Sequence, residues 1–429
     1  ALLPPILRRV LLKRRLLARC LALTALIGCI IWLAGSFPQP PPPPSQSETP
    51  AAQAKDGMVV SSLTPAANQN GPSLPNYRVH IFYYAWYGEP GTDGAWLHWN
   101  HSRLPHWNAE RARKFSQAGH TPPGDIGANF YPELGPYSSA NISVVRRHFA
   151  QIRRSGAGTV VVSWYPPGMA DGNGRPVDRL VPMLLSAARE FQLRLALHIE
   201  PYAGRSPANL RRHLRYIAAT HARHPAFYRE RTRDGRWLPV HYIYDSYRIP
   251  RSLWRPLLLG GGLGGSASIR GKSEDALMFG LAMSIGDCQT IKESGFDGAY
   301  TYFAADGFTQ ASTRSNWAAM SRQCSTAGVA FAPSIGPGYI DTAVRPWNAE
   351  NTRQREGGRY YTDGLRTAIA ARPVFLSITS FNEWHEGTQI EPAAPRYGYL
   401  DYTPRKRDHY LDLTAQYAAL FKPDTSAGL

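Results

Sequence analysis

Two glutamates three residues apart, Glu383 and Glu386, lie within the run SFNEWHEG at residues 380–387. Glycoside hydrolysis needs two carboxyl groups across the scissile bond, one to give a proton and one to act as base or nucleophile. Crowding by the partner carboxylate and by aromatic neighbours would keep one of them protonated near neutral pH. The competing interpretation is a pair of surface glutamates on a short helix. Their position directly after an apolar run, between Asn382 and a Trp-His pair, favours the catalytic interpretation.

Polar and aromatic residues also follow several other apolar runs. Aromatic faces stack on the apolar faces of sugar rings, and carboxylates and imidazoles bind hydroxyl groups. A lone tyrosine at a strand end more often serves packing, so these residues indicate a site only if the fold brings them together. The predicted substrate-binding residues are Tyr84, Trp86, Tyr165, His198, Glu200, His241, Tyr302, Asn382 and Trp384.

The apolar runs themselves predict the fold that positions these residues. Stretches with helical periodicity, such as 142–154, 179–191 and 207–220, lie between most of them, and this alternation predicts a parallel sheet covered on both faces. Eight repeats predict an α/β fold of the (β/α)₈ TIM-barrel type, with its site at the C-terminal ends of the strands. A doubly wound open sheet is the alternative, but no G-x-G-x-x-G follows an early strand. The eight strand candidates are 80–86, 158–165, 194–201, 239–246, 276–284, 297–303, 329–336 and 374–381.

The N-terminal region predicts a membrane anchor and a stem. Residues 1–19 carry six Lys and Arg and no acid, and residues 20–37 are uncharged. An uncharged run of this length after a basic cluster favours an uncleaved type II signal anchor, with a cleavable signal peptide as the alternative. Pro40 to Pro44 opens a Pro-rich stretch that cannot join a packed core. The expected order is a cytosolic tail (1–19), a transmembrane anchor (20–37), a disordered stem (38–76) and a catalytic barrel (77–423).

Composition excludes several classes of protein. The chain has 429 residues, of which 43% are hydrophobic, so a wholly disordered protein is excluded. The four cysteines, Cys20, Cys29, Cys288 and Cys324, are too few and too far apart for a disulfide-dense scaffold or a Cys-x-x-Cys zinc site. The net charge of +17 is compatible with nucleic acid, but we interpret it as a solvated basic surface and predict no nucleic-acid partner.

Three further patterns bear on other possible functions. His98, His101 and His106 are candidate zinc ligands, although a zinc site usually needs a fourth ligand. The run GSASIRGKS at 265–273 misses the phosphate-loop spacing by one residue, so we expect residues 260–275 to form a flexible loop. A glycosyltransferase with a metal-binding Asp-x-Asp motif is disfavoured, because no two aspartates lie two positions apart.

Long runs in the chain resemble glycoside hydrolase family 99, the endo-α-1,2-mannosidase family of the Golgi. The resemblance covers about residues 77–423. The runs that carry it are DIGANFYPELGPYSS (125–139), SWYPPGMADGNG (163–174), HIEPY (198–202), YIYDSY (242–247), GFDGAYTYFA (295–304), PSIGPGYIDTAVRPWN (333–348) and SITSFNEWHEGTQIEPA (377–393).

The resemblance implies retaining hydrolysis of an internal α-1,2-mannoside bond in a high-mannose N-glycan whose terminal mannose bears glucose. Glu383 would deprotonate the 2-hydroxyl of the mannose, giving a 1,2-anhydro sugar, and Glu386 would be the acid/base. Tyr84, His198, Glu200, His241 and Tyr302 would be sugar contacts, and Tyr165 would line the glucose-bearing subsite. The resemblance also implies no metal or other cofactor, and a type II Golgi membrane protein with a lumenal catalytic domain. An inactive lectin-like reader of the same glycans is the alternative.

Two sequons and two cysteines add expectations about surface and redox chemistry. Asn141 follows a turn-like stretch and is expected to be exposed, whereas Asn100 lies among aromatic residues and is expected to be inaccessible. Cys288 and Cys324 lie in helical stretches that flank the predicted strand 297–303. Whether they are bridged depends on a Cα separation that the sequence leaves open.

Overall fold

The computed structural model describes residues 74–260 and 265–423. The predicted anchor and the predicted stem up to residue 73 lie outside the described residues. Within the described ranges, no helix combines the length and apolar character needed to cross a membrane. These residues divide into two compact units. One is the segment Pro105–Phe115, which contains the short helix α3 (Ala109–Ala112), and the other contains the strands and the remaining helices.

The larger unit is built on one sheet whose nine main strands run parallel. A tenth strand, β4 (Arg229–Arg231), lies off this path and pairs antiparallel with β5. In spatial order the main strands are β8 (Ala330–Ala332), β7 (Gly298–Tyr300), β6 (Leu277–Leu281), β5 (Trp237–Ile243), β3 (Arg194–Ile199), β2 (Ala157–Trp164), β1 (Asn76–Tyr83), β10 (Leu376–Ile378) and β9 (Ser334–Ile335).

The two ends of this path belong to one extended segment. β8 and β9 are separated only by Pro333, and they pair on opposite sides, β8 with β7 and β9 with β10. Proline has no N–H to donate, which accounts for the break in the ladder at that residue. The sheet is therefore a nearly closed parallel barrel. Counting β8 and β9 as one position gives eight, and each position coincides with a predicted strand.

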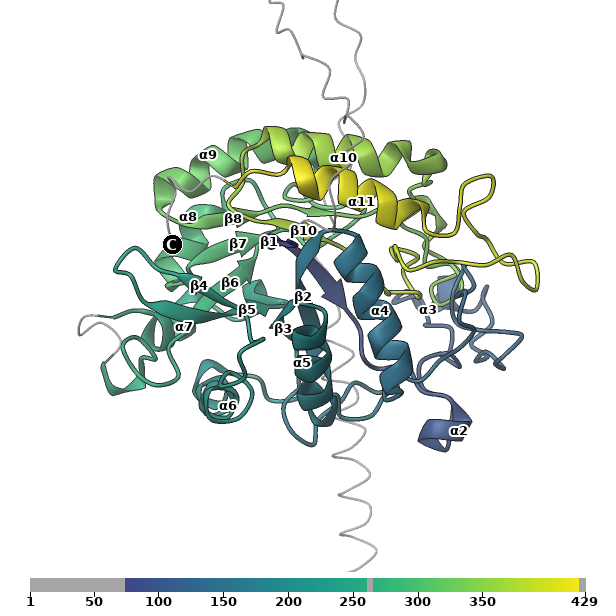
Figure 1. Ribbon diagram of the computed structural model, residues 1–429, viewed down its shortest axis with the longest axis horizontal. Coiled ribbons are helices and arrows are strands. Elements are labelled where there is room, and N and C mark those ends of the chain that lie inside the picture. Colours follow the sequence, from purple (N-terminus) through teal and green to yellow (C-terminus); the bar gives the residue numbers. More distant parts are fainter. Residues whose placement is uncertain (1–73, 261–264, 424–429) are drawn as a thin grey trace, which may run out of the picture. The chain divides into compact units, whose positions relative to one another are not determined.

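A helix follows each of the eight strand positions, as the alternating pattern predicts, and the helices lie outside the strands (Figure 1). Local caps explain several helix starts: Asn141 accepts from the Ser143 N–H, and Ser206 and Asn209 form a capping box. In chain order these helices are α4 (Ile142–Arg154), α5 (Val181–Glu190), α6 (Pro207–Ala219), α7 (Arg251–Leu258), α8 (Asp287–Ser294), α9 (Trp317–Ala327), α10 (Arg359–Ala370) and α11 (His409–Leu420); the short helix α2 (Pro90–Asp93) follows β1.

Side chains alternate between the barrel interior and the helical layer along each strand. The ring of Phe82 on β1 lies 5.6 Å from that of Tyr242 on β5, and Tyr242 lies 4.9 Å from Tyr300 on β7. These strands are not neighbours in the sheet, so all three rings must point into the interior. The interior is a packed layer of aromatic rings that supports the side chains at the C-terminal ends of the strands.

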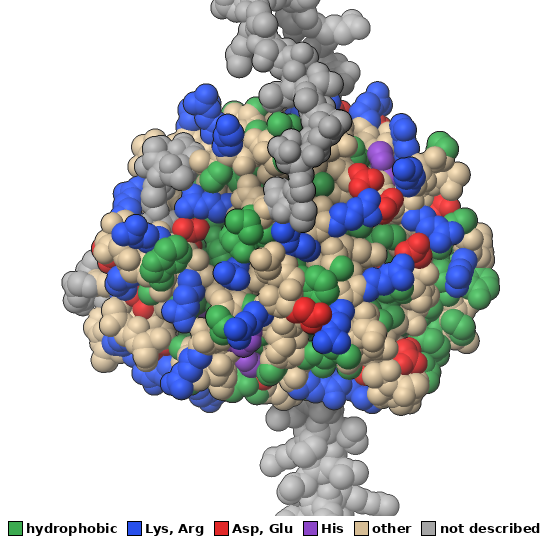
Figure 2. Space-filling view, viewed as in Figure 1, with side chains coloured by type: hydrophobic (Ala, Val, Ile, Leu, Met, Phe, Trp, Pro, Cys, Tyr) green, Lys and Arg blue, Asp and Glu red, His purple; other side chains and the backbone are tan. Residues whose placement is uncertain are grey.

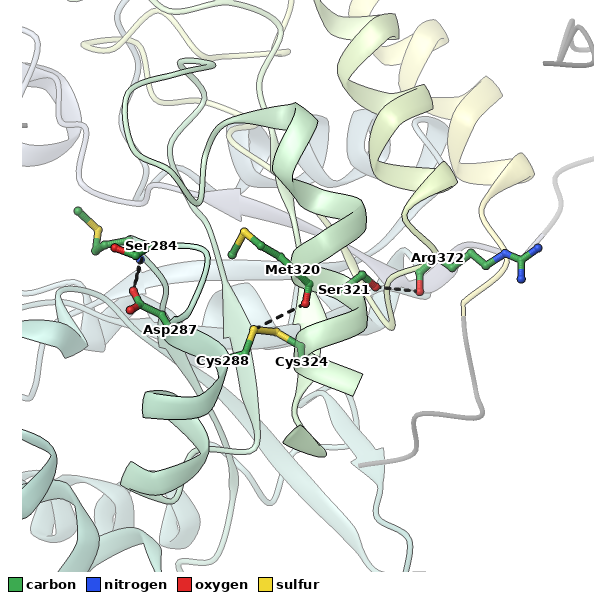
Figure 3. Close-up of a disulfide and its surroundings, with 8 residues drawn as sticks. Ser284, Asp287, Cys288, Met320, Ser321, Cys324 and Arg372 are labelled. Carbon is green, nitrogen blue, oxygen red and sulfur yellow. Dashed lines mark hydrogen bonds between the residues drawn. A yellow bond between two sulfur atoms is a disulfide. The ribbon is translucent and has the colours of Figure 1, made fainter. Parts of the chain in front are cut away.

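Cys288 on α8 and Cys324 on α9 form a disulfide, with their Cα atoms 4.9 Å apart (Figure 3). Both cysteines are buried, and the Met320 carbonyl oxygen lies close to the Cys288 sulfur. The bridge joins the two helices that flank β7. The sequence placed the two cysteines in these helices but did not decide whether they are bridged. It cross-links two consecutive β/α units of the barrel.

The surface corrects the expectation for one of the two sequons. Asn100 is exposed, as is Asn141, so the aromatic residues around Asn100 in the sequence do not cover it. Of the predicted flexible loop, residues 261–264 lie outside the described residues, and in the rest the Arg270 guanidinium group pairs with Asp275 at 3.3 Å and with Asp297 at 2.8 Å. The Lys and Arg side chains in Figure 2 are spread over the visible face among acidic and apolar groups, which is typical of a solvated basic surface.

Candidate functional site

Glu383 and Glu386 lie in the turn that follows β10, at the C-terminal end of the barrel. They are not surface residues of a helix: Glu383 is 3% exposed, and the Glu386 side chain is 25% exposed. The Glu383 N–H donates to Ser380 Oγ at 2.8 Å, and the Glu383 carboxylate accepts from the His385 N–H at 3.0 Å. The turn therefore holds the Glu383 carboxylate and its backbone in place.

Burial changes the acidity of both carboxyl groups. The pKa of Glu383 is raised well above its ordinary value, first by burial and then by the negative charge of Glu386. Burial also raises the pKa of Glu386, to about 7; Arg345 opposes the rise, and Asp341 and Glu200 add to it. Because interacting carboxyl groups titrate together, these values belong to the pair. A pair of this kind retains a proton close to neutral pH, as general acid catalysis requires.

Tyr84 and Tyr302 bring two phenol groups to the same rim from β1 and β7, and their hydroxyl groups are hydrogen-bonded to each other. Tyr302 has a φ of 53°, in the left-handed region that a tyrosine seldom adopts. Its N–H donates to Ser334 Oγ at 2.8 Å, and its carbonyl accepts from Thr379 Oγ1 at 2.6 Å. Backbone strain of this kind, about 1–3 kcal/mol, persists where the surroundings fix the residue, and it clusters at functional sites.

His198 and Glu200 extend the rim from β3. The His198 ring stacks on that of Tyr302 with 5.5 Å between centroids, and His198 Nε2 lies 2.9 Å from the Tyr300 hydroxyl. Glu200 accepts from Ser163 Oγ at 2.8 Å, and its carboxylate lies 3.3 Å from His198 Nδ1. Glu200 also raises the pKa of Glu386, so β3 supplies a third carboxylate to the electrostatics of the pair.

Trp86 and Tyr165 lie half-buried beyond β1 and β2. The Trp86 ring is 4.5 Å from that of Tyr84 and stacks on His98 at 4.4 Å. Burial and then Glu200 raise the pKa of Tyr165, which places this phenol within electrostatic range of the β3 carboxylate. Two predicted substrate-binding residues are thus brought to the rim.

Three other predicted site residues lie behind this rim or away from it. Asn382 is fully buried and bonds the backbone of Tyr84 in both directions at 2.8 Å, so it fastens the turn after β10 to the end of β1. The indole of Trp384 is fully buried and donates to Glu391 at 2.9 Å. His241 belongs to the face of β5 opposite Tyr242, with its ring near Phe227, so the strand does not bring it to the carboxylates.

Of the three histidines considered as zinc ligands, His98 and His101 are neighbours, whereas His106 belongs to the other compact unit. The rings of His98 and His101 lie 6.3 Å apart, and His98 Nε2 lies 3.3 Å from an Asp171 oxygen. His106 belongs to the separate unit Pro105–Phe115, where its Nδ1 accepts from the Asn108 N–H. In residues 74–260 and 265–423, no group of three or more His, Cys, Asp or Glu side chains has a metal-binding arrangement.

The groups that support the carboxylates were not among the residues predicted from the sequence. Arg345 and Asp341 come from the loop after β9, some forty residues before the glutamates, and no short motif joins the two segments. Glu391 is buried and accepts from Tyr137, His148 and Trp384 at 2.8–3.1 Å. Glu391, between Ile390 and Pro392, belongs to no catalytic motif, so this network was visible only in the fold.

Comparison with known proteins gives a consistent result. Residues 74–423 match the model of the family described as Glycosyl hydrolase family 99. The chain is 48% identical over 348 residues to a glycoprotein endo-alpha-1,2-mannosidase of Xenopus laevis, covering 80% of this chain and 77% of that protein. The protein of the same name from Mus musculus is 46% identical over 365 residues, 84% of this chain and 78% of its own length.

A solved structure agrees with these relatives. The GH99 endo-alpha-mannosidase from Bacteroides thetaiotaomicron is 40% identical to the chain, with a TM-score of 0.74, and the match covers 81% of this chain and 98% of that one. The range matched by the family model contains the whole barrel and both glutamates. The similarity therefore extends over the part of the chain that builds the site.

The Glu391 network gives a prediction about stability. Glu391→Gln replaces a carboxylate oxygen with an amide donor, so at least one buried donor among Tyr137, His148 and Trp384 loses its partner. A buried unsatisfied polar group costs about 1–3 kcal/mol, and the free energy of unfolding should fall by that amount in urea denaturation. Glu190→Gln is the control, because Glu190 pairs with Arg146 at the surface and such pairs contribute about 0–1 kcal/mol. Equal effects of the two variants would contradict the buried network.

Proposed function

The chain belongs to glycosyl hydrolase family 99 and is a glycoside hydrolase, and we propose that it is a retaining endo-α-1,2-mannosidase that releases glucosylated mannose from high-mannose N-glycans. The observation that carries this proposal is the pair of carboxyl groups with raised pKa, Glu383 and Glu386, at the C-terminal end of the barrel. The relatives named glycoprotein endo-alpha-1,2-mannosidase support the choice of bond. The aromatic rim formed by Tyr84, Trp86 and Tyr302 supports a sugar substrate.

The proposed reaction has two steps. In the first, Glu383 takes the proton of the mannose 2-hydroxyl, O2 attacks C1 from the face opposite the leaving group, and Glu386 gives its proton to the departing glycosidic oxygen. The product in the site is a 1,2-anhydro sugar. In the second, Glu386 takes a proton from water, the water oxygen attacks C1, and Glu383 returns its proton to O2. Two inversions at C1 give net retention.

Stereochemistry supports this assignment, and the acidity of Glu386 suits the two roles proposed for it. In an α-mannoside the axial 2-hydroxyl lies opposite the axial leaving group, so O2 can attack C1 from the back once its proton is removed. A pKa of about 7 leaves Glu386 able to give a proton in the first step and take one in the second. The raised pKa of Glu383 opposes its role as base, so the substrate has to favour the ionised form, as a sugar hydroxyl that donates to the carboxylate does.

The direct test is hydrolysis of a monoglucosylated high-mannose glycan by the catalytic domain, with and without a chelator. We expect release of a glucosyl-mannose disaccharide at the same rate in both samples. The alternative is the lectin-like protein that binds these glycans without cleaving them. Binding without release of the disaccharide would support that alternative and refute the proposed activity.

The two glutamates should differ in their dependence on the leaving group. Glu386→Gln should lose most activity on a natural glycan and much less on an activated aryl or fluoride substrate, because a good leaving group needs little protonation. Glu383→Gln should be impaired on both, since ring closure by O2 occurs in each case. General acid or base catalysis contributes roughly 10²–10⁴-fold, so comparison of kcat/KM on the two substrates resolves the contrast.

A 2-deoxy substrate provides the matched control for this contrast. It has no O2 to attack C1, so the wild-type protein should not cleave it. Near-normal cleavage, together with a covalent adduct on Glu383 detected by mass spectrometry, would replace the anhydro-sugar route with the ordinary two-carboxylate mechanism.

We further propose that the protein is a single-pass type II Golgi membrane protein with a lumenal barrel. The basic residues 1–19 before the uncharged run 20–37 support this orientation. The buried disulfide between Cys288 and Cys324 supports it independently, because such bridges are typical of compartments outside the cytosol.

Protease digestion of sealed Golgi vesicles tests the orientation. The barrel should survive intact without detergent and be degraded when detergent opens the vesicles, whereas an epitope placed at the N-terminus should be removed in both cases. Digestion of the barrel in sealed vesicles would show that it faces the cytosol.

A further inference from the structure

We propose that Arg345 is a positioning residue for Glu386, whose fixed positive charge holds the acid/base carboxyl at the barrel rim and sets its protonation. The inference rests on the proposed role of Glu386 as acid/base. It concerns a residue from a different loop, which sequence analysis did not select.

Arg345 lies close enough to act on Glu386. Its Nη1 is 3.7 Å from Glu386 Oε1 and 3.0 Å from Asp341 Oδ2, and its side chain is 32% exposed. At 3.7 Å the contact with Glu386 is an ion pair rather than a hydrogen bond. The guanidinium group thus bridges two carboxyl groups, one buried and fixed, the other at the reacting position.

The anchoring carboxylate is held rigidly. Asp341 is fully buried and accepts from the Tyr339 hydroxyl at 2.8 Å and from the Asn348 amide at 2.9 Å. Its backbone carbonyl accepts from the Arg345 N–H at 2.7 Å, so the arginine begins from a fixed turn. The neighbouring Ile340 N–H donates to the Glu386 carbonyl at 2.9 Å, which fastens this turn to the one that carries Glu386.

The charged groups that face Glu386 explain why the arginine matters. Four neutral phenol groups, from the ends of three strands and from the loop after β9, lie within electrostatic range of Glu386: Tyr84, Tyr244, Tyr302 and Tyr339. The charged groups are Arg345, which is positive, and Asp341 and Glu200, which are negative. Arg345 thus supplies positive charge opposite these two carboxylates.

The direction of the effect follows from these charges. Burial, Asp341 and Glu200 raise the pKa of Glu386, and Arg345 lowers it, with the balance at about 7. Arg345 also lowers the pKa of Glu383. Without the arginine both carboxyl groups would hold their protons more tightly. A smaller fraction of each would then be ionised near neutral pH, so fewer molecules would have Glu383 available as base in the first step and Glu386 available as base in the second.

The test compares the pH dependence of kcat/KM in four proteins: wild type, Arg345→Gln, Arg345→Lys and Arg353→Gln. Loss of the charge should move the bell-shaped profile of Arg345→Gln to higher pH by about 1–3 pH units, the usual effect of one opposite charge at this distance. Arg345→Lys keeps the charge and should remain near wild type. Arg353→Gln is the matched control, because the guanidinium group of Arg353 donates to backbone carbonyls and not to a carboxylate.

A second measurement does not depend on turnover. Titration of ¹³C-labelled glutamate carboxyl groups by NMR, with the Glu386 signal identified by its absence from Glu386→Gln, should show the same rise in the Arg345→Gln protein. If the wild type cleaves no glycan, the proposed function fails, while this titration still tests the action of Arg345. Should Arg345→Gln fail to fold, as judged by urea denaturation, Arg345→Met keeps much of the side-chain length without the charge.

The contrary result is a raised KM in Arg345→Gln with an unchanged pH profile and an unchanged Glu386 titration. That outcome would make Arg345 a residue that contacts the substrate directly and would overturn the positioning role. Equal shifts in Arg345→Gln and Arg353→Gln would also overturn it, because loss of any nearby arginine would then have the same effect.

Discussion

The rest of the site depends on two carboxyl groups of like charge that are buried within one short turn. Burial disfavours the charged form of each, and the charge of one disfavours ionisation of the other. Glu383 and Glu386 respond in the same direction, with pKa values above the ordinary range. Burial of two carboxyl groups that repel each other is unfavourable, so contacts from the surrounding fold have to hold them in place. In exchange, a proton is available at the barrel rim near neutral pH.

The surrounding fold meets this demand through contacts between separate strands and loops. Asn382 fastens the turn to the end of β1, and Ile340 fastens it to the loop after β9. Behind the turn, Glu391 gathers three buried donors and fixes the Trp384 indole. These groups touch no predicted reacting atom. Their effect is to restrict the turn to one conformation, and such preorganisation holds catalytic groups in their productive geometry.

The barrel decides which residues of a strand face the site. His198 and Tyr242 occupy paired positions on β3 and β5 and both point into the interior. His241, one residue earlier than Tyr242, points the other way and packs near Phe227. A motif that looks suitable in sequence can thus lie on the wrong face, because neighbouring residues of a strand alternate between the two layers. The same alternation brings Glu200 to the rim two residues after His198.

The sequence by itself determined the eight strand positions, the alternation with helices, and the turn that carries both glutamates, because these depend on local apolar patterning and on spacing within one segment. It also indicated that Tyr84, Tyr302, His198 and Glu200 lie at the rim of the barrel, since strand ends converge in any parallel barrel. Only the tertiary structure decided that His241 faces away, that Trp384 and Asn382 lie behind the rim, that Cys288 and Cys324 are bridged, and that Arg345 faces Glu386. Each of these depends on a side-chain direction, or on a contact between segments far apart in the chain. Local patterning carries no information about such distances, because packing of the whole barrel sets them.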